Sequence, residues 1–132
     1  MIDLFERQQR FIQDDIPTRL AKLANHLAEI KSLAASSTNL DVASNLMREG
    51  QFFLEWTVPD IVETDVDLAA ELVDLGRTLA RWQSHWPKIC LDAATLAQVS
   101  VEAGAMSERV LEISAMLTAI VEDRALAMRN AN

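Results

Sequence analysis

Hydrophobic residues recur at steps of three and four along almost the whole chain, which is the spacing of one face of an α-helix. The first long stretch shows this spacing in the series Ile16, Leu20, Leu23, Leu27, Ile30 and Ala34. Upstream of it, similar steps join Ile2, Phe5, Gln9 and Ile12. Residues 2–14 and the stretch that follows are therefore both predicted to be helical.

A proline lies at the junction of these two stretches. Pro17 lacks a backbone N–H, and in a continuous helix its ring would clash with the carbonyl four residues earlier. Asp14 and Asp15, just before it, are good N-cap residues for a helix that begins there. The first helix is therefore expected to kink or to restart near Asp15, and the sequence leaves both alternatives open.

The middle of the chain predicts two further helices. The second is expected to begin after Ser37 or Thr38, and its apolar stripe is Leu40, Ala43, Met47, Gly50 and Leu54. The segment TVPD then ends it, because Thr57 followed by Asp60 resembles a capping box for the next helix. The third helix has the clearest stripe, at the a and d spacing of a heptad, formed by Ile61, Leu68, Leu72, Leu75, Leu79, Trp82 and Trp86.

The last predicted helix is long and runs from about Asp92 to Met128. Its stripe consists of Val99, Ala103, Met106, Val110, Ile113, Leu117 and Ile120. Gly104 interrupts this helix, and glycine costs about 1 kcal/mol relative to alanine in the middle of a helix. A bend or a close approach of another helix is therefore expected at Gly104.

Short loops between these helices predict an all-α, up-down-up-down four-helix bundle in which neighbouring helices are antiparallel. The chain, residues 1–132, is expected to form this one domain, with the first and last helices extended. These two helices then lie side by side, and their extra lengths fall at the same pole. Residues 2–14 are therefore predicted to pack on residues 114–128 as a two-helix extension beyond the four-helix body.

Composition agrees with a helical fold and narrows the range of partners. Three Gly, three Pro and no Tyr among 132 residues are too few turn formers for a β-fold. The net charge of −8, without any basic cluster, argues against binding to nucleic acid or to an anionic membrane. The first residues lack the apolar run of a signal peptide, and no stretch approaches the ~18 apolar residues of a membrane span. With a single cysteine, the protein is interpreted as cytoplasmic.

One short stretch, from Trp82 to Cys90, gathers residues that could carry chemistry. Trp82 and Trp86 continue the stripe of the third helix, so they are interpreted as part of the core or its end cap. His85 lies one position off that stripe, where it could reach the last carbonyls of its own helix. No Glu lies three residues before His26 or His85, as the Glu-x-x-His pairs of di-iron bundles require, so neither a metal nor a cofactor is predicted.

Cys90 is the one candidate nucleophile. A thiol at the start of a helix can have its pKa lowered by the positive end of the helix dipole. Lone cysteines in helical proteins are, however, mostly small buried hydrophobes. No catalytic residue is therefore predicted, and an enzyme is the third choice of function.

The favoured hypothesis is a non-enzymatic helical module that acts through protein–protein contacts, either with a protein partner or with itself as a homodimer. The apolar stripe extends beyond the four-helix body. The interface of the module is therefore expected on the terminal extension, at Phe5, Phe11, Ile12, Leu117 and Val121. The alternative is a small-ligand or cofactor-binding bundle. Its candidate pocket is lined by Trp56, Trp82, His85, Trp86 and Cys90.

Overall fold

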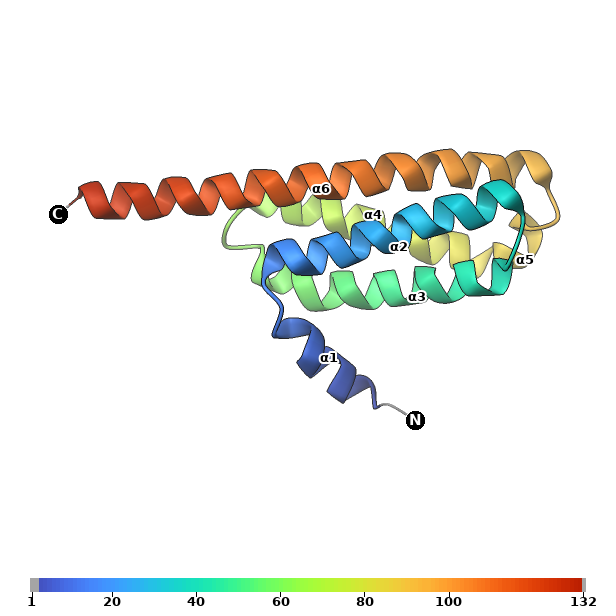
Figure 1. Ribbon diagram of the computed structural model, residues 1–132, viewed down its shortest axis with the longest axis horizontal. Coiled ribbons are helices and arrows are strands. Elements are labelled where there is room, and N and C mark those ends of the chain that lie inside the picture. Colours follow the sequence, from blue (N-terminus) through green and yellow to red (C-terminus); the bar gives the residue numbers. More distant parts are fainter. Residues whose placement is uncertain (1–2, 132) are drawn as a thin grey trace.

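The computed structural model describes residues 3–131, and every regular element within that range is helical. The elements in chain order are α1 (Leu4–Ile12), α2 (Ile16–Ser36), α3 (Leu40–Thr57), the 3-10 turn η1 (Val58–Asp60), α4 (Val66–Ser84), α5 (Trp86–Ile89) and α6 (Ala93–Asn130) (Figure 1). The predicted all-α class is confirmed.

The four long helices, α2, α3, α4 and α6, contribute to one hydrophobic core. The predicted stripes supply its most deeply buried side chains, among them Leu20, Leu27, Met47, Leu72, Leu79 and Ile113. Helix α2 packs along both α6 and α3, and α3 packs along α4. The helical periodicity of the sequence therefore identified the buried face of each long helix.

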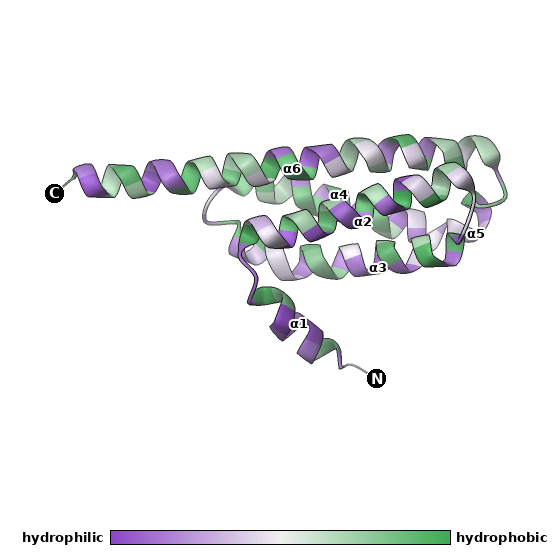
Figure 2. Cartoon of the chain, in the orientation of Figure 1, coloured by the Kyte–Doolittle hydropathy of each residue, from purple (hydrophilic) through white to green (hydrophobic). Residues whose placement is uncertain are grey.

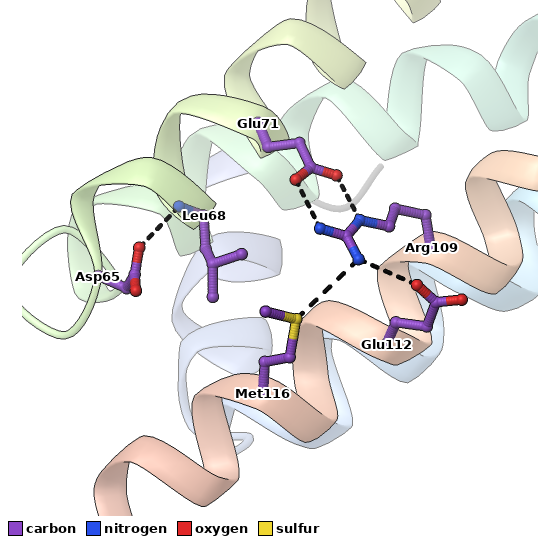
Figure 3. Close-up of polar contacts among 6 residues, drawn as sticks. All are labelled: Asp65, Leu68, Glu71, Arg109, Glu112 and Met116. Atoms are coloured by element: carbon purple, nitrogen blue, oxygen red, sulfur yellow. Dashed lines mark hydrogen bonds and ion pairs between the residues drawn. The ribbon is translucent and has the colours of Figure 1, made fainter.

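An ion pair joins α4 to α6, which make few other contacts with each other. The Arg109 guanidinium donates to both carboxylate oxygens of Glu71, at 2.6 and 2.9 Å, and to Glu112 of its own helix at 2.9 Å (Figure 3). The hydrogen bonds from Arg109 lower the pKa of Glu71 below its ordinary value. Because both side chains are partly exposed, the ion pair connects the two helices but contributes only modestly to stability.

The chain restarts near Asp15, so the second of the two alternatives for the first helix is the one observed. Helix α1 ends at Ile12, and the Asp15 carboxylate caps α2 by accepting a hydrogen bond of 2.9 Å from the Thr18 amide. The buried Arg19 side chain donates to the carbonyls of Ile12 and Asp14, at 2.7 and 2.9 Å, and so holds the turn.

The predicted extension, in which residues 2–14 pack on residues 114–128, is wrong for residues 3–14, and residue 2 lies outside the described residues. Helix α1 turns away from α6 and lies against α3 (Figure 1). The Phe11 ring stacks on Phe53 with 4.4 Å between ring centroids, and Arg7 pairs with Glu49 at 3.1 Å. The physical reason is the turn held by Arg19, which directs α1 to an aromatic surface of α3 where Phe11 becomes buried.

The start of the third long helix also differs from the prediction. The chain first forms η1 and a turn, and α4 begins at Val66 with the Asp65 carboxylate capping the Leu68 amide at 2.9 Å (Figure 3). The capping box expected from Thr57 and Asp60 does not form, because Asp60 pairs with Arg19 at 2.7 Å. A tertiary ion pair therefore replaces the local contact that the sequence suggested.

Candidate functional site

The stretch from Trp82 to Cys90 closes the end of the body at which α4 stops. Trp82 and Trp86 are buried, and the Trp86 indole N–H donates to the Leu40 carbonyl at 2.7 Å. The His85 Nδ1 lies 2.9 Å from the Arg81 carbonyl of its own helix, as predicted. These side chains therefore serve the packing of the helix ends.

Cys90 lacks the electrostatic environment of a reactive thiol. It follows α5 and is half-buried, and burial raises the pKa of its thiol above the ordinary value. A raised pKa leaves less of the nucleophilic thiolate near neutral pH. This environment agrees with a buried structural cysteine and gives no support to the lowered thiol pKa that was the alternative.

The structure does not bring the five predicted pocket residues together. Trp56 lies at the far end of α3, where its ring is 5.5 Å from Phe52 and 5.8 Å from Phe11 between centroids. Trp82 and His85 line a surface cavity of about 390 Å³, with the remaining walls formed by Arg81, Ile89, Thr95, Gln98, Val99 and Glu102. Trp56 lies near the C-terminal end of α3, and Trp82 lies near the C-terminal end of α4. Because these helices run in opposite directions, the predicted pocket residues are divided between opposite ends of the body (Figure 1).

A polar cluster that the sequence did not predict anchors α1 to the body. One carboxylate oxygen of Glu49 pairs with Arg7 at 3.1 Å, and the other lies 2.7 Å from His26 Nε2. Burial acts to raise the pKa of Glu49, but the hydrogen bonds and charges of His26 and Arg7 outweigh it, so this pKa is lowered. The three residues lie on three different helices, and no spacing along the chain relates them.

The five predicted interface residues lie in two separate places. Phe11 is buried under α1, Ile12 is half-buried and Phe5 is exposed on the same helix. Leu117 and Val121 lie on α6, which α1 turns away from, and line one groove together with the start of α2. A single contact surface formed by all five is therefore not present, whereas the pair on α6 remains a candidate.

The last turns of α6 extend past all the other helices (Figure 1). Every residue from Val121 to Ala131 is exposed, including the large apolar side chains of Val121, Leu126 and Met128. Figure 2 shows hydrophobic segments alternating with hydrophilic ones along this end. Steps of four, three and four place Leu117, Val121, Arg124 and Met128 on one face. The core stripe of α6 therefore continues beyond the core.

An apolar groove lies at the base of this free end. It has a volume of about 410 Å³ and runs between the start of α2, the turn after η1 and α6. Its lining residues are Asp15, Ile16, Pro17, Asp60, Ile61, Thr64, Leu117, Thr118, Val121 and Glu122. The floor is thus apolar while carboxylates stand at the rim, and a hydrogen bond from Thr18 lowers the pKa of Asp15.

The groove combines residues from three parts of the chain, and only its α6 wall has a signal in the sequence. That signal is the stripe that runs on from Leu117 to Val121. Within residues 3–131, no three His, Cys, Asp or Glu side chains are grouped so that they could hold a metal ion. No helix in the same range is both long and apolar enough to cross a membrane. Comparison of the chain with protein-family models, with curated proteins and with solved structures found no match.

Proposed function

We propose that this protein is a non-enzymatic helical interaction module that self-associates through the free end of α6 and the apolar groove at its base. One observation carries the proposal: the core stripe of α6 continues past Leu117 to apolar side chains that stay largely exposed. Leu117 is buried, whereas Val121 and Met128 on the same face are 55% and 74% exposed.

The energetics of a free helix end support this proposal. Isolated helices shorter than ~12–15 residues are marginal in water, and in proteins most helical stability comes from packing an apolar face. A partner helix in the groove would cover Val121 and Met128. Fully burying a side chain of this size contributes about 1.5–3 kcal/mol. Association would therefore stabilise the end of α6 and remove apolar surface from water.

We also propose that the body of the protein is an up-down-up-down four-helix bundle. Each long helix reverses the direction of the one before it in Figure 1, and α2 packs on both α3 and α6. The Arg109–Glu71 ion pair connects α6 to α4 on the remaining side. In this arrangement the buried tryptophans close one pole of the body, and the free end of α6 leaves from the other.

Sedimentation velocity over a wide concentration range tests the self-association. The informative variant is Val121→Asp, and the matched control is Leu126→Asp, because the two side chains are 55% and 53% exposed but lie ~140° apart around α6. The wild type and Leu126→Asp are expected to associate, whereas Val121→Asp remains monomeric with unchanged helicity. A wild type that stays monomeric at the highest concentration would contradict the proposal, as would equal effects of the two substitutions.

A further inference from the structure

We infer that the protein forms a two-fold symmetric dimer in which the free ends of two α6 helices pair in antiparallel fashion, so that Met128 of each copy covers the groove of the other. The inference rests on the proposed self-association and adds the occupant of the groove, its direction and its register.

The face of α6 that borders the groove continues to the end of the helix, with Arg124 at one side of it donating to the Thr64 carbonyl of its own body. Thr118, Val121 and Glu122 are the groove residues from this part of the helix. Steps of three and four carry the same face onward to Ala125, Met128 and Arg129. All three of these residues are exposed. A helix seated in the groove would therefore lie along Val121, Ala125 and Met128.

Charge determines the direction of the second helix. Glu122 and Arg129 are seven residues apart on the bordering face, one on each side of Ala125. In an antiparallel pair centred near Ala125, Glu122 of each copy faces Arg129 of the other, which forms two ion pairs by symmetry. A parallel pair in register would leave Glu122 of one copy ~10 Å along the helix axis from Arg129 of the other, so it would form neither ion pair. The same residues therefore favour the antiparallel pair.

The register follows from the size of the side chains. Ala125 lies at the two-fold axis, where its small side chain lets the two helices approach closely. Val121 of one copy then lies opposite Met128 of the other, because each is three or four residues, or ~5–6 Å, from the axis. Arg129 of the second copy reaches the groove rim, where Glu122 provides a carboxylate; Asp15 and Asp60 also lie at the rim but already bind Thr18 and Arg19.

The bodies of the two copies do not compete for space in this arrangement. Leu117, the last fully packed residue of the α6 stripe, lies eight residues from Ala125. The two Leu117 residues are therefore ~24 Å apart along the helix direction. Groove residues of the body lie beside α6 as far as Glu122, three residues from Ala125, so ~9 Å separates the two bodies along that direction. Only the last turn of the second helix enters each groove.

Disulfide trapping tests this geometry in a Cys90→Ser background, which removes the native thiol. Ala125→Cys is expected to form a covalent dimer with itself, about tenfold or more faster than the control Leu126→Cys on another face of the same helix end. An equimolar mixture of Val121→Cys and Met128→Cys is expected to form the mixed dimer in preference to either homodimer. Charge reversal is an independent test, since Arg129→Glu should weaken dimerisation several-fold at low salt and Glu122→Arg in the same chain should restore it.

Sedimentation and cross-linking together distinguish a failure of the proposed self-association from a failure of the antiparallel pair alone. A wild type that remains monomeric in sedimentation overturns the proposed self-association and the antiparallel pair with it. A wild-type dimer in which Ala125→Cys cross-links no faster than Leu126→Cys overturns the antiparallel pair alone. A wild-type dimer in which Val121→Cys and Met128→Cys each cross-link only to themselves does so as well, and would indicate a parallel pair.

Discussion

The hydroxyl of Thr57 is buried where α3 ends and has no hydrogen-bond partner among residues 3–131. A buried polar group without a partner costs about 1–3 kcal/mol. Thr57→Val keeps the shape of the side chain and removes that group, so the free energy of unfolding is expected to rise by about 1 kcal/mol. Denaturation in urea measures this change. Thr78→Val is the control, because the Thr78 hydroxyl has a partner and donates to the Asp74 carbonyl at 3.3 Å. A loss of stability in Thr57→Val would contradict the expectation.

Glu71 should make folding stability depend on pH. Its pKa in the folded protein lies below the ordinary value of 4.5, because Arg109 donates hydrogen bonds to the carboxylate. The ion pair therefore contributes stability above that pH, and the contribution is lost as the pH falls through the lower, folded-state pKa. Glu71→Gln is expected to lower the melting temperature by a few degrees at neutral pH, with the two proteins converging in acid.

Thermal melts of the wild type and of Glu71→Gln, from neutral to strongly acid pH, measure the difference between their melting temperatures. Glu112→Gln provides the matched control, since Glu112 contacts the same guanidinium but its side chain is more exposed, at 63% against 41% for Glu71. Its effect should be smaller, because exposed ion pairs contribute little. A constant difference between wild type and Glu71→Gln down to strongly acid pH would refute the role given to this pair.

Helix α1 should open independently of the rest of the chain. Its nine residues contact mainly α3, and Phe11 is its one buried residue. Phe11→Ala removes the stack on Phe53 and is expected to abolish hydrogen-exchange protection in α1, while α2, α3 and α6 keep theirs. Phe5→Ala is the control, since Phe5 is 63% exposed and its loss should leave α1 protected. Equal loss of protection throughout the chain would show that α1 is an integral part of the core.

A Cβ atom added at Gly104 and one added at Gly50 would meet neighbours that differ in their freedom to move. A Cβ atom at Gly104 would lie 2.9 Å from Lys31 Cδ, which belongs to an exposed and flexible side chain that can move aside. At Gly50 the new atom would lie 3.0 Å from Leu79 Cδ1 and 3.4 Å from Leu23 Cδ1, both in the packed core. Gly104→Ala is therefore expected to stabilise the protein by up to about 1 kcal/mol through helix propensity.

Gly50→Ala has the same gain in propensity but must displace buried side chains, so it should be less stable than Gly104→Ala. Urea denaturation of both variants against the wild type measures the difference. The reverse order of stabilities would mean that the core around Gly50 adapts more readily than Lys31 does.

The molecule as a whole consists of a packed body and a helix end that projects from it. Arg124 still reaches the body, since its guanidinium donates to the Thr64 carbonyl at 2.8 Å. A variant lacking residues 125–132 therefore keeps this contact and loses the proposed dimer face. At low concentration its melting temperature should match that of the wild type within about 3 °C. At high concentration only the wild type should gain stability, because dimerisation stabilises the folded state by mass action. A truncated protein whose melting temperature still rises with concentration would place the dimer interface elsewhere.

The sequence predicted the helices well, because helical periodicity is a local property that each segment carries by itself. The stripe from Ile16 to Ala34 and the stripe from Val99 to Leu117 supply much of the core. Asp15 caps α2, as its position before Pro17 suggested. Where the local signal was weaker, as at Thr57 and Asp60, a longer-range ion pair with Arg19 decided the structure instead.

The sequence by itself determined the all-α class, the buried face of each long helix and the packing role of the residues from Trp82 to Trp86. Only the tertiary structure decided that α1 folds onto α3, that Trp56 lies apart from Trp82, and that Ile16, Ile61 and Val121 form one groove. The physical reason is that periodicity fixes which side of a helix is apolar, whereas turns and distant contacts fix which apolar sides meet. The uncovered end of α6 shows this difference, since its stripe is visible in the sequence but its exposure depends on where every other helix stops.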